Sequence, residues 1–152
     1  MNLKKALTPD TIVPALKGTT KETVIEELVD LLVATGKIKD RLAALRAVLD
    51  RERKMSTGMQ CGIAIPHGKT ASVDGLVAAF GLKREGINFD SLDGLPTHIF
   101  VMTLSPENRT GPHIQFLAEI GRQLNDPQIR ERLLRVNTAD EILNIIAGEN
   151  QP

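Results

Sequence analysis

The chain has 152 residues, of which 41% are hydrophobic and 25% charged, and this composition predicts one folded domain over residues 1–152 rather than a disordered chain. Lysine plus arginine and aspartate plus glutamate both number 19, so the net charge of zero gives no general attraction to nucleic acid or anionic lipid. Aromatic residues make up only 3%, which leaves no stacking surface for single-stranded nucleic acid, and we expect no nucleic-acid partner.

The N-terminal segment differs from a secretory signal peptide, because Pro9, Asp10 and Pro14 interrupt the unbroken apolar stretch that such a peptide needs. Apolar runs elsewhere, such as residues 76–80, are far shorter than a membrane-spanning helix. The single cysteine, Cys61, has no partner for a disulfide within the chain and is typical of a reducing compartment. We therefore expect a cytoplasmic protein that is not embedded in a membrane.

Two helices are predicted in the first third of the chain. The first begins at a capping box formed by Thr19 and Glu22 and ends at Gly36. The second begins after Asp40, and its apolar positions predict a buried face made of Leu42, Leu45, Val48 and Leu49. This helix ends in the charged run 50–54, which we expect to be solvated.

The middle of the chain changes to short apolar runs bounded by turn residues. These runs predict three strands, at residues 62–65, 76–82 and 98–104. Helical periodicity then returns after Gly111 and Pro112, over residues 113–124.

Two more helices are predicted near the C-terminus. One begins at Asp126 and Pro127, and the last begins at a capping box formed by Thr138 and Glu141. Helices, then strands, then helices indicate an α/β domain in which helices cover a sheet.

The segment Gly68-Lys69-Thr70 ends like a phosphate-binding P-loop, but the rest of the motif is missing. Ile63 occupies the position where the motif needs a glycine, and Pro66 stands where backbone amides should point at phosphates. A nucleotide-binding P-loop is therefore rejected.

His67 is the first candidate for chemistry in this segment. A short apolar run ends at Pro66, which would deliver the imidazole to the carboxyl end of a strand, where ligands gather in open α/β sheets. Gly68 is expected to leave space beside the ring, and a neutral imidazole is a nucleophile near pH 7. The alternative is a turn histidine whose ring is satisfied by hydrogen bonds.

His113 is the second candidate, in the first turn of the helix that follows Gly111 and Pro112. The free N–H groups and the dipole at a helix N-terminus favour anions and should keep this histidine neutral, which suits a hydrogen-bond donor to phosphate. The alternative is a core histidine bonded to a carbonyl. His98 lies beside no glycine or helix end, and we expect it to be structural or on the surface.

Metal and hydrolytic chemistry have weak support in the sequence. No closely spaced pair of histidine or cysteine ligands is present, so we expect no metal and no other cofactor, and a metal-dependent hydrolase is the weakest alternative. No Gly-x-Ser-x-Gly elbow occurs either. Cys61 lies in what reads as an apolar strand, which argues against a reactive thiol.

Several motifs in a fixed order resemble one known family. These are Arg51-Glu52-Arg53, Ser56-Thr57-Gly58, the run from Gly62 to Lys69, the run from Phe89 to Gly94, and the helices at residues 113–124 and 138–146. Together they resemble the fructose/mannitol-type enzyme IIA of the bacterial phosphoenolpyruvate-dependent phosphotransferase system. Within that family, the Ser-Thr-Gly and Ile-Pro-His-Gly-Lys segments are most similar to the nitrogen-regulatory branch. Cys61 stands where mannitol-type members tend to carry a polar or acidic residue, which weakens a mannitol assignment.

The resemblance implies an α/β fold with a mixed β-sheet flanked by helices. It implies that His67 is the phosphorylated histidine, and it carries the family's active-site arginine to Arg51 and its second histidine to His113. The implied partners are HPr or an HPr-like phosphocarrier as donor, and an enzyme IIB or regulatory target proteins afterwards.

Two readings of that resemblance stay open. In one the chain is a regulatory module, binding potassium-transport or sensor-kinase proteins, in which phosphorylation is the switch. In the other it is a fructose-specific enzyme IIA that donates its phosphoryl group to a IIB cysteine for sugar uptake.

Overall fold

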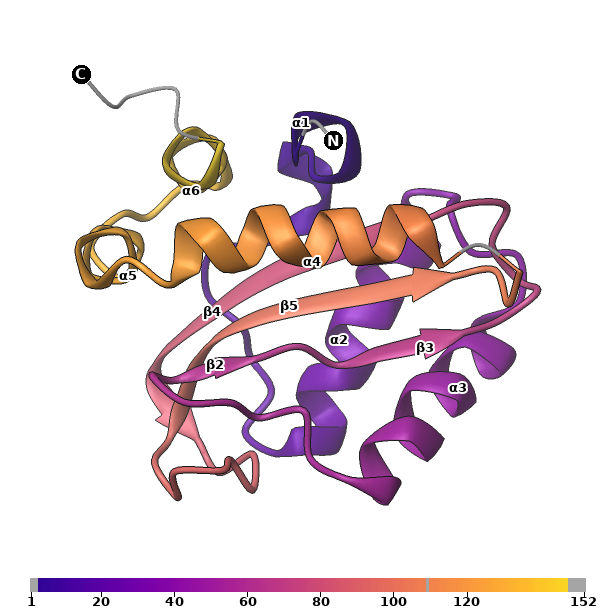
Figure 1. Cartoon of the computed structure of the whole chain (residues 1–152), viewed down its shortest axis with the longest axis horizontal. Coiled ribbons are helices and arrows are strands. Elements are labelled where there is room, and N and C mark those ends of the chain that lie inside the picture. Colours follow the sequence, from indigo (N-terminus) through magenta and orange to yellow (C-terminus); the bar gives the residue numbers. More distant parts are fainter. Residues whose placement is uncertain (1–2, 109, 148–152) are drawn as a thin grey trace.

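The computed structural model describes residues 3–108 and 110–147, which form three layers (Figure 1). Helices α2 and α3 cover one face of a five-stranded sheet, and α4 to α6 cover the other. In chain order the elements are α1 (Leu3–Ala6), the 3-10 turn η1 (Pro9–Thr11), β1 (Ile12–Val13), α2 (Lys21–Ala34), α3 (Arg41–Lys54), β2 (Ile63–Ala64), β3 (His67–Lys69), β4 (Val77–Ile87), β5 (Thr97–Ser105), α4 (Gly111–Leu124), α5 (Pro127–Leu133) and α6 (Ala139–Ile146).

The sheet is mixed, as the family resemblance implied. Strands β4 and β5 pair antiparallel, whereas β1 pairs parallel with β4, and both β2 and β3 pair parallel with β5. The short strands β2 and β3 therefore form one interrupted edge of the sheet. The break falls at Ile65 and Pro66, and pairing with β5 resumes at His67. Strand β2 ends before Pro66, as predicted, but the expectation that His67 lies at the carboxyl end of the strand is wrong, because His67 begins β3.

Side-chain caps set the starts of α2 and α3, with one shift from the prediction. Helix α2 is capped by Thr20 and not by Thr19. The Thr20 hydroxyl accepts from the backbone N–H of Thr23, and the Thr23 hydroxyl accepts in turn from the backbone N–H of Thr20. The predicted cap at Asp40 is confirmed, since its carboxylate accepts from the N–H of Ala43.

Helix α3 is buried differently from the predicted pattern. Leu42 is 63% exposed, and Glu52, in the charged run expected to be solvated, is only 5% exposed. Helical spacing alone placed Leu42 on the inner face, but the buried stripe of α3 consists of Ala44, Leu45, Val48 and Glu52, and Leu42 lies outside it. Glu52 is inside because a lysine of α2 and a threonine of the following loop meet its carboxylate there.

Strand β5 distributes its side chains between the two halves of the core. Phe100, Met102 and Leu104 belong to the cluster under α2 and α3, whereas Ile99 and Val101 belong to the cluster under α4 to α6. Because side chains alternate along a strand, Thr103 follows Ile99 and Val101 and lies on the α4 side.

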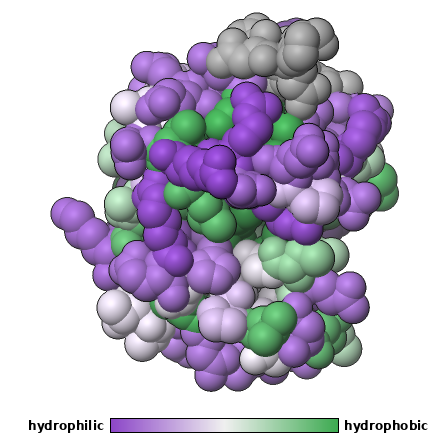
Figure 2. All heavy atoms as spheres, turned by 90° about the vertical axis from the view of Figure 1, so that its left-hand side faces the viewer, coloured by the Kyte–Doolittle hydropathy of each residue, from purple (hydrophilic) through white to green (hydrophobic). Residues whose placement is uncertain are grey.

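In the described part of the chain, no helix is long and apolar enough to cross a membrane. The face drawn in Figure 2 shows mainly hydrophilic side chains, with separate patches of apolar ones between them.

Candidate functional site

Three polar side chains from three elements meet on the α4 side of the sheet. His67 of β3 is paired in register with Thr103 of β5, so the two side chains lie on the same face. The Thr103 hydroxyl lies 2.9 Å from Nε2 of His113, in the first turn of α4. The rings of His67 and His113 have centroids 5.6 Å apart and an interplanar angle of 41°. The fold thus brings together the two histidines that the sequence singled out.

The ring of His67 is oriented by a single backbone contact. Its Nδ1 lies 2.9 Å from the carbonyl oxygen of Ile65. A carbonyl only accepts hydrogen bonds, so this contact requires a proton on Nδ1, and the neutral ring then carries its lone pair on Nε2. His67 is a half-buried strand residue rather than a turn residue, and its contact with Ile65 occupies only one of the two ring nitrogens.

His113 is held in the neutral form. Burial of its half-buried ring lowers the pKa of His113 below its ordinary value, and the charges of His67 and Lys69 lower it further. The prediction of a neutral His113 is therefore confirmed, although burial is the first cause rather than the helix dipole. Its partner is the Thr103 hydroxyl and not the carbonyl of the core alternative.

Gly68 serves packing and does not leave the ring space that the sequence suggested. A Cβ at this position would lie 2.9 Å from the backbone carbonyl carbon of Ala47 and 3.0 Å from its Cβ. The glycine therefore lets α3 approach β3 closely, on the face opposite His67. Close packing there fixes the strand that carries the imidazole.

Arg51 lies in the last turn of α3, one turn beyond Ala47 and hence on the same side of that helix. Its Nη1 donates to the carbonyl oxygen of Met55 at 2.8 Å, an interaction that closes the end of the helix. The histidine pair is thus assembled in this structure, whereas the guanidinium of Arg51 is bonded to the end of its own helix and has no hydrogen bond to either described ring.

Two residues of this cluster were missed by sequence reasoning. Thr103 is the polar residue in the otherwise apolar run 99–104, and this break in the pattern is the signal that could have identified it. Lys69 is two residues beyond His67 in β3 and so shares its face, and its charge reaches His113. In the sequence Lys69 was considered as part of the rejected P-loop and of the run from Gly62 to Lys69 that carries the family resemblance, but it was given no role in the site, and the structure places it in a strand that no helix follows directly.

The remaining candidates lie away from this cluster. His98 has its Nδ1 at 3.1 and 3.0 Å from the carbonyl oxygens of Lys83 and Arg84, so the prediction of a structural histidine is confirmed. Cys61 is exposed in a turn with φ of +65°, which corrects the expectation of an apolar strand. Over residues 3–108 and 110–147, no group of three or more histidine, cysteine or acidic residues is arranged to hold a metal ion.

Comparison with known proteins identifies the family. Residues 5–149 match the model of the family described as phosphoenolpyruvate-dependent sugar phosphotransferase system, EIIA 2. The chain belongs to this EIIA family. The predicted family and α/β fold are therefore confirmed, and the function that membership shows is that of an EIIA-type phosphoryl carrier.

Relatives of the chain carry two kinds of names. It is 40% identical over 146 residues to the fructose-specific EIIABC component of Bacillus subtilis, which covers 96% of this chain but only 23% of that longer protein. It is 40% identical to the fructose-specific EIIA component of Haloferax volcanii, covering 84% of this chain and 83% of the relative. A nitrogen regulatory protein of Bradyrhizobium diazoefficiens is 31% identical, covering 97% of this chain and 95% of the relative.

Solved structures show the same fold. The nitrogen regulatory protein IIA-Ntr of Neisseria meningitidis superposes with a TM-score of 0.87 at 32% identity, covering 95% of this chain and 98% of that one. The IIA mannitol protein of Escherichia coli gives a TM-score of 0.79 at 26% identity, covering 92% of this chain and 98% of that one.

Proposed function

We propose that Nε2 of His67 accepts a phosphoryl group from the phosphohistidine of HPr or an HPr-like carrier. The observation that carries this proposal is the hydrogen bond from Nδ1 of His67 to Ile65, which leaves the lone pair of a neutral ring on Nε2. The bond from Nε2 to phosphorus forms as the bond from phosphorus to the donor imidazole breaks, and the donor nitrogen recovers its lone pair. No metal or other cofactor is needed for this exchange between two imidazoles.

Catalysis of such a transfer rests on positioning and on charge, because the negative charge of the transition state is spread over the oxygens of the phosphoryl group. The neutral ring of His113 supplies an N–H, and the free backbone N–H groups at the start of α4 lie next to it. Lys69 adds a positive charge on the same face of β3. Arg51 would complete the site when its guanidinium binds two phosphoryl oxygens.

The test is phosphorylation with phosphoenolpyruvate, enzyme I and HPr. The wild-type protein should acquire one acid-labile, base-stable phosphoryl group, whereas His67→Ala should acquire none. His98→Gln is the matched control and should be labelled like the wild type, because His98 is bonded to the backbone of β4. Arg51→Ala should fold normally but accept the group roughly 100-fold more slowly. Full labelling of His67→Ala would overturn the proposal.

The destination of the phosphoryl group has two candidates. The fold match to IIA-Ntr, with a TM-score of 0.87, favours a regulatory protein in which phosphorylation changes which targets bind. The 40% identity to fructose-specific components favours delivery to a IIB cysteine for sugar uptake. A complex of enzyme IIA with phosphorylated enzyme IIB is known for the mannitol system of Escherichia coli, a relative at 27% identity and a TM-score of 0.80.

We place the regulatory role first, and both roles have the protein act in the cytoplasm, where HPr would reach it. Incubating the phosphorylated protein with a fructose-type IIB protein separates the two roles. A regulatory protein should keep its phosphoryl group, and transfer to the IIB cysteine within seconds would establish the transport role instead.

A further inference from the structure

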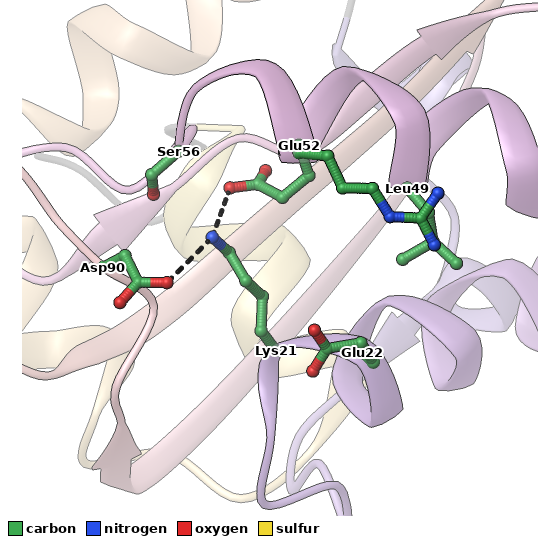
Figure 3. A pocket seen from close by; sticks show the side chains of 7 residues that line it. Lys21, Glu22, Leu49, Glu52, Ser56 and Asp90 are labelled. Carbon is green, nitrogen blue, oxygen red and sulfur yellow. Dashed lines mark hydrogen bonds and ion pairs between the residues drawn. The ribbon is translucent and has the colours of Figure 1, made fainter.

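A buried ion pair joins the start of α2 to the last turn of α3 (Figure 3). Nζ of Lys21, at the start of α2, is 3.0 Å from Oε2 of Glu52 and 3.3 Å from Oδ2 of Asp90. The side chain of Glu52 is 4% exposed and that of Lys21 is 16% exposed. Lys21 also lies 5.0 Å from the centroid of the Phe89 ring. Burying two charges is costly, so the pair has to be supported by further hydrogen bonds.

Besides the ion pair, the carboxylate of Glu52 accepts hydrogen bonds from a single residue, Thr57. The backbone N–H of Thr57 donates to Oε2 at 2.8 Å, and the Thr57 hydroxyl donates to Oε1 at 2.5 Å. Both contacts involve an ionised acceptor, which makes such hydrogen bonds stronger than neutral ones. Thr57 is thereby fixed at two atoms relative to α3 and, through Lys21, relative to α2.

Two hydrogen bonds connect Thr57, through Ile65, to the ring of His67. Its carbonyl oxygen accepts from the N–H of Ile65 at 3.1 Å, and the carbonyl oxygen of Ile65 accepts from Nδ1 of His67 at 2.9 Å. Ile65 lies in the gap between β2 and β3, so the ladder with β5 does not hold it at this point. Its two polar backbone groups are instead occupied by Thr57 and by the imidazole.

We infer that Lys21 and Glu52 are positioning residues that set the tautomer of His67 through Thr57 and the Ile65 carbonyl. This inference rests on the proposed function of His67, and it adds a support that begins on the opposite face of the sheet. A fixed Ile65 carbonyl holds the proton on Nδ1 and keeps Nε2 aimed at the donor. A purely structural ion pair would stabilise the fold and leave the His67 tautomer alone.

The tautomer of each histidine is measured directly by long-range 15N–1H NMR on protein with 15N-labelled histidine, at a pH where the rings are neutral. The wild type should show His67 with its proton on Nδ1 only. Glu52→Gln removes the charge opposite Lys21 and leaves one acceptor oxygen in place of two, so the hold on Thr57 weakens and its His67 should become a mixture of both tautomers. The rate of transfer from phospho-HPr should fall about 10- to 100-fold.

Asp30→Asn is the matched control. It removes the same charge from an ion pair that also joins α2 to α3, through Arg41, but at the exposed far end of the two helices. Its His67 tautomer and its transfer rate should equal those of the wild type. His98 is an internal control in every sample, because two carbonyl oxygens hold its Nδ1 independently of Glu52.

A second variant keeps the inference testable if Glu52→Gln does not fold. Thr57→Val removes the hydroxyl at nearly constant volume and should give the same mixture of tautomers in a weaker form. A single Nδ1–H tautomer and an unchanged rate in the folded variants would overturn the inference. If His67→Ala is still phosphorylated, the proposed function fails while the tautomer result stands, so the two failures are distinguishable.

Discussion

The three histidines of this chain differ because their partners differ. His98 is held by two carbonyl oxygens, His113 by a hydroxyl, and His67 by one carbonyl that occupies only Nδ1. His67 and His98 both contact carbonyl oxygens through Nδ1, but His67 stands on the edge strand β3 beside His113, with ring centroids 5.6 Å apart. His113 stands beside it as a neutral donor. The division of roles follows from the hydrogen bonds of each ring together with its place in the fold.

Phosphorylation of His67 should raise the pKa of His113. In the unmodified protein, burial first and then repulsion from the neighbouring His67 and Lys69 side chains hold this pKa below its ordinary value. A phosphoryl group brings about −1.5 to −2 charges at pH 7, which favours the protonated form of a neighbouring imidazole. A 1H NMR titration of His113 with and without phosphorylation measures the shift. An unchanged or lowered pKa would remove His113 from the vicinity of the phosphoryl group, and His98 should stay constant in both samples.

The sequence identified the histidines and missed their supports for physical reasons. Proline, glycine and helix-start signals around His67 and His113 are local, so they are visible in the chain. Thr103 and Glu52 act only after folding, because their partners come from other elements. A charged residue inside a run such as 50–54 is normally solvated, and nothing in that run reveals that Lys21 will cover it.

At the scale of elements, the approach of α3 to β3 sets the geometry of the site. The backbone of Ala47 lies where a side chain on Gly68 would be, so the glycine determines how deeply the helix settles on the strand. Sequence patterns predicted both elements, but the spacing between them depends on this single long-range contact. For that reason Gly68 was assigned to ring access when its role is packing.

Gly68→Ala should destabilise the protein by about 1–3 kcal/mol, because the new methyl group would meet backbone rather than a movable side-chain tip. Urea unfolding measures the change in the free energy of unfolding. Gly75→Ala is the control, since a Cβ there meets nothing within 4 Å, and its effect should stay within about 0.5 kcal/mol. Equal stability of the two variants would contradict the packing role of Gly68.

At the scale of the whole molecule, the site depends on the order of the strands in the sheet. The β3 strand lies beside β5 although β4 comes between them in the chain, and only this pairing puts His67 next to Thr103. Element types and most helix starts could be predicted from local patterns. The strand order, the two-residue strand β1 and the split of β2 from β3 could not, because each depends on pairing between distant segments.

The most direct test of the account is the position of the phosphoryl group on the imidazole. The structure predicts that, after phosphorylation through HPr, a 31P and 15N NMR spectrum of histidine-labelled protein shows phosphorus bonded to Nε2 of His67, with the proton still on Nδ1. A phosphoryl group on Nδ1 of His67, or on any other residue, would contradict the central claim.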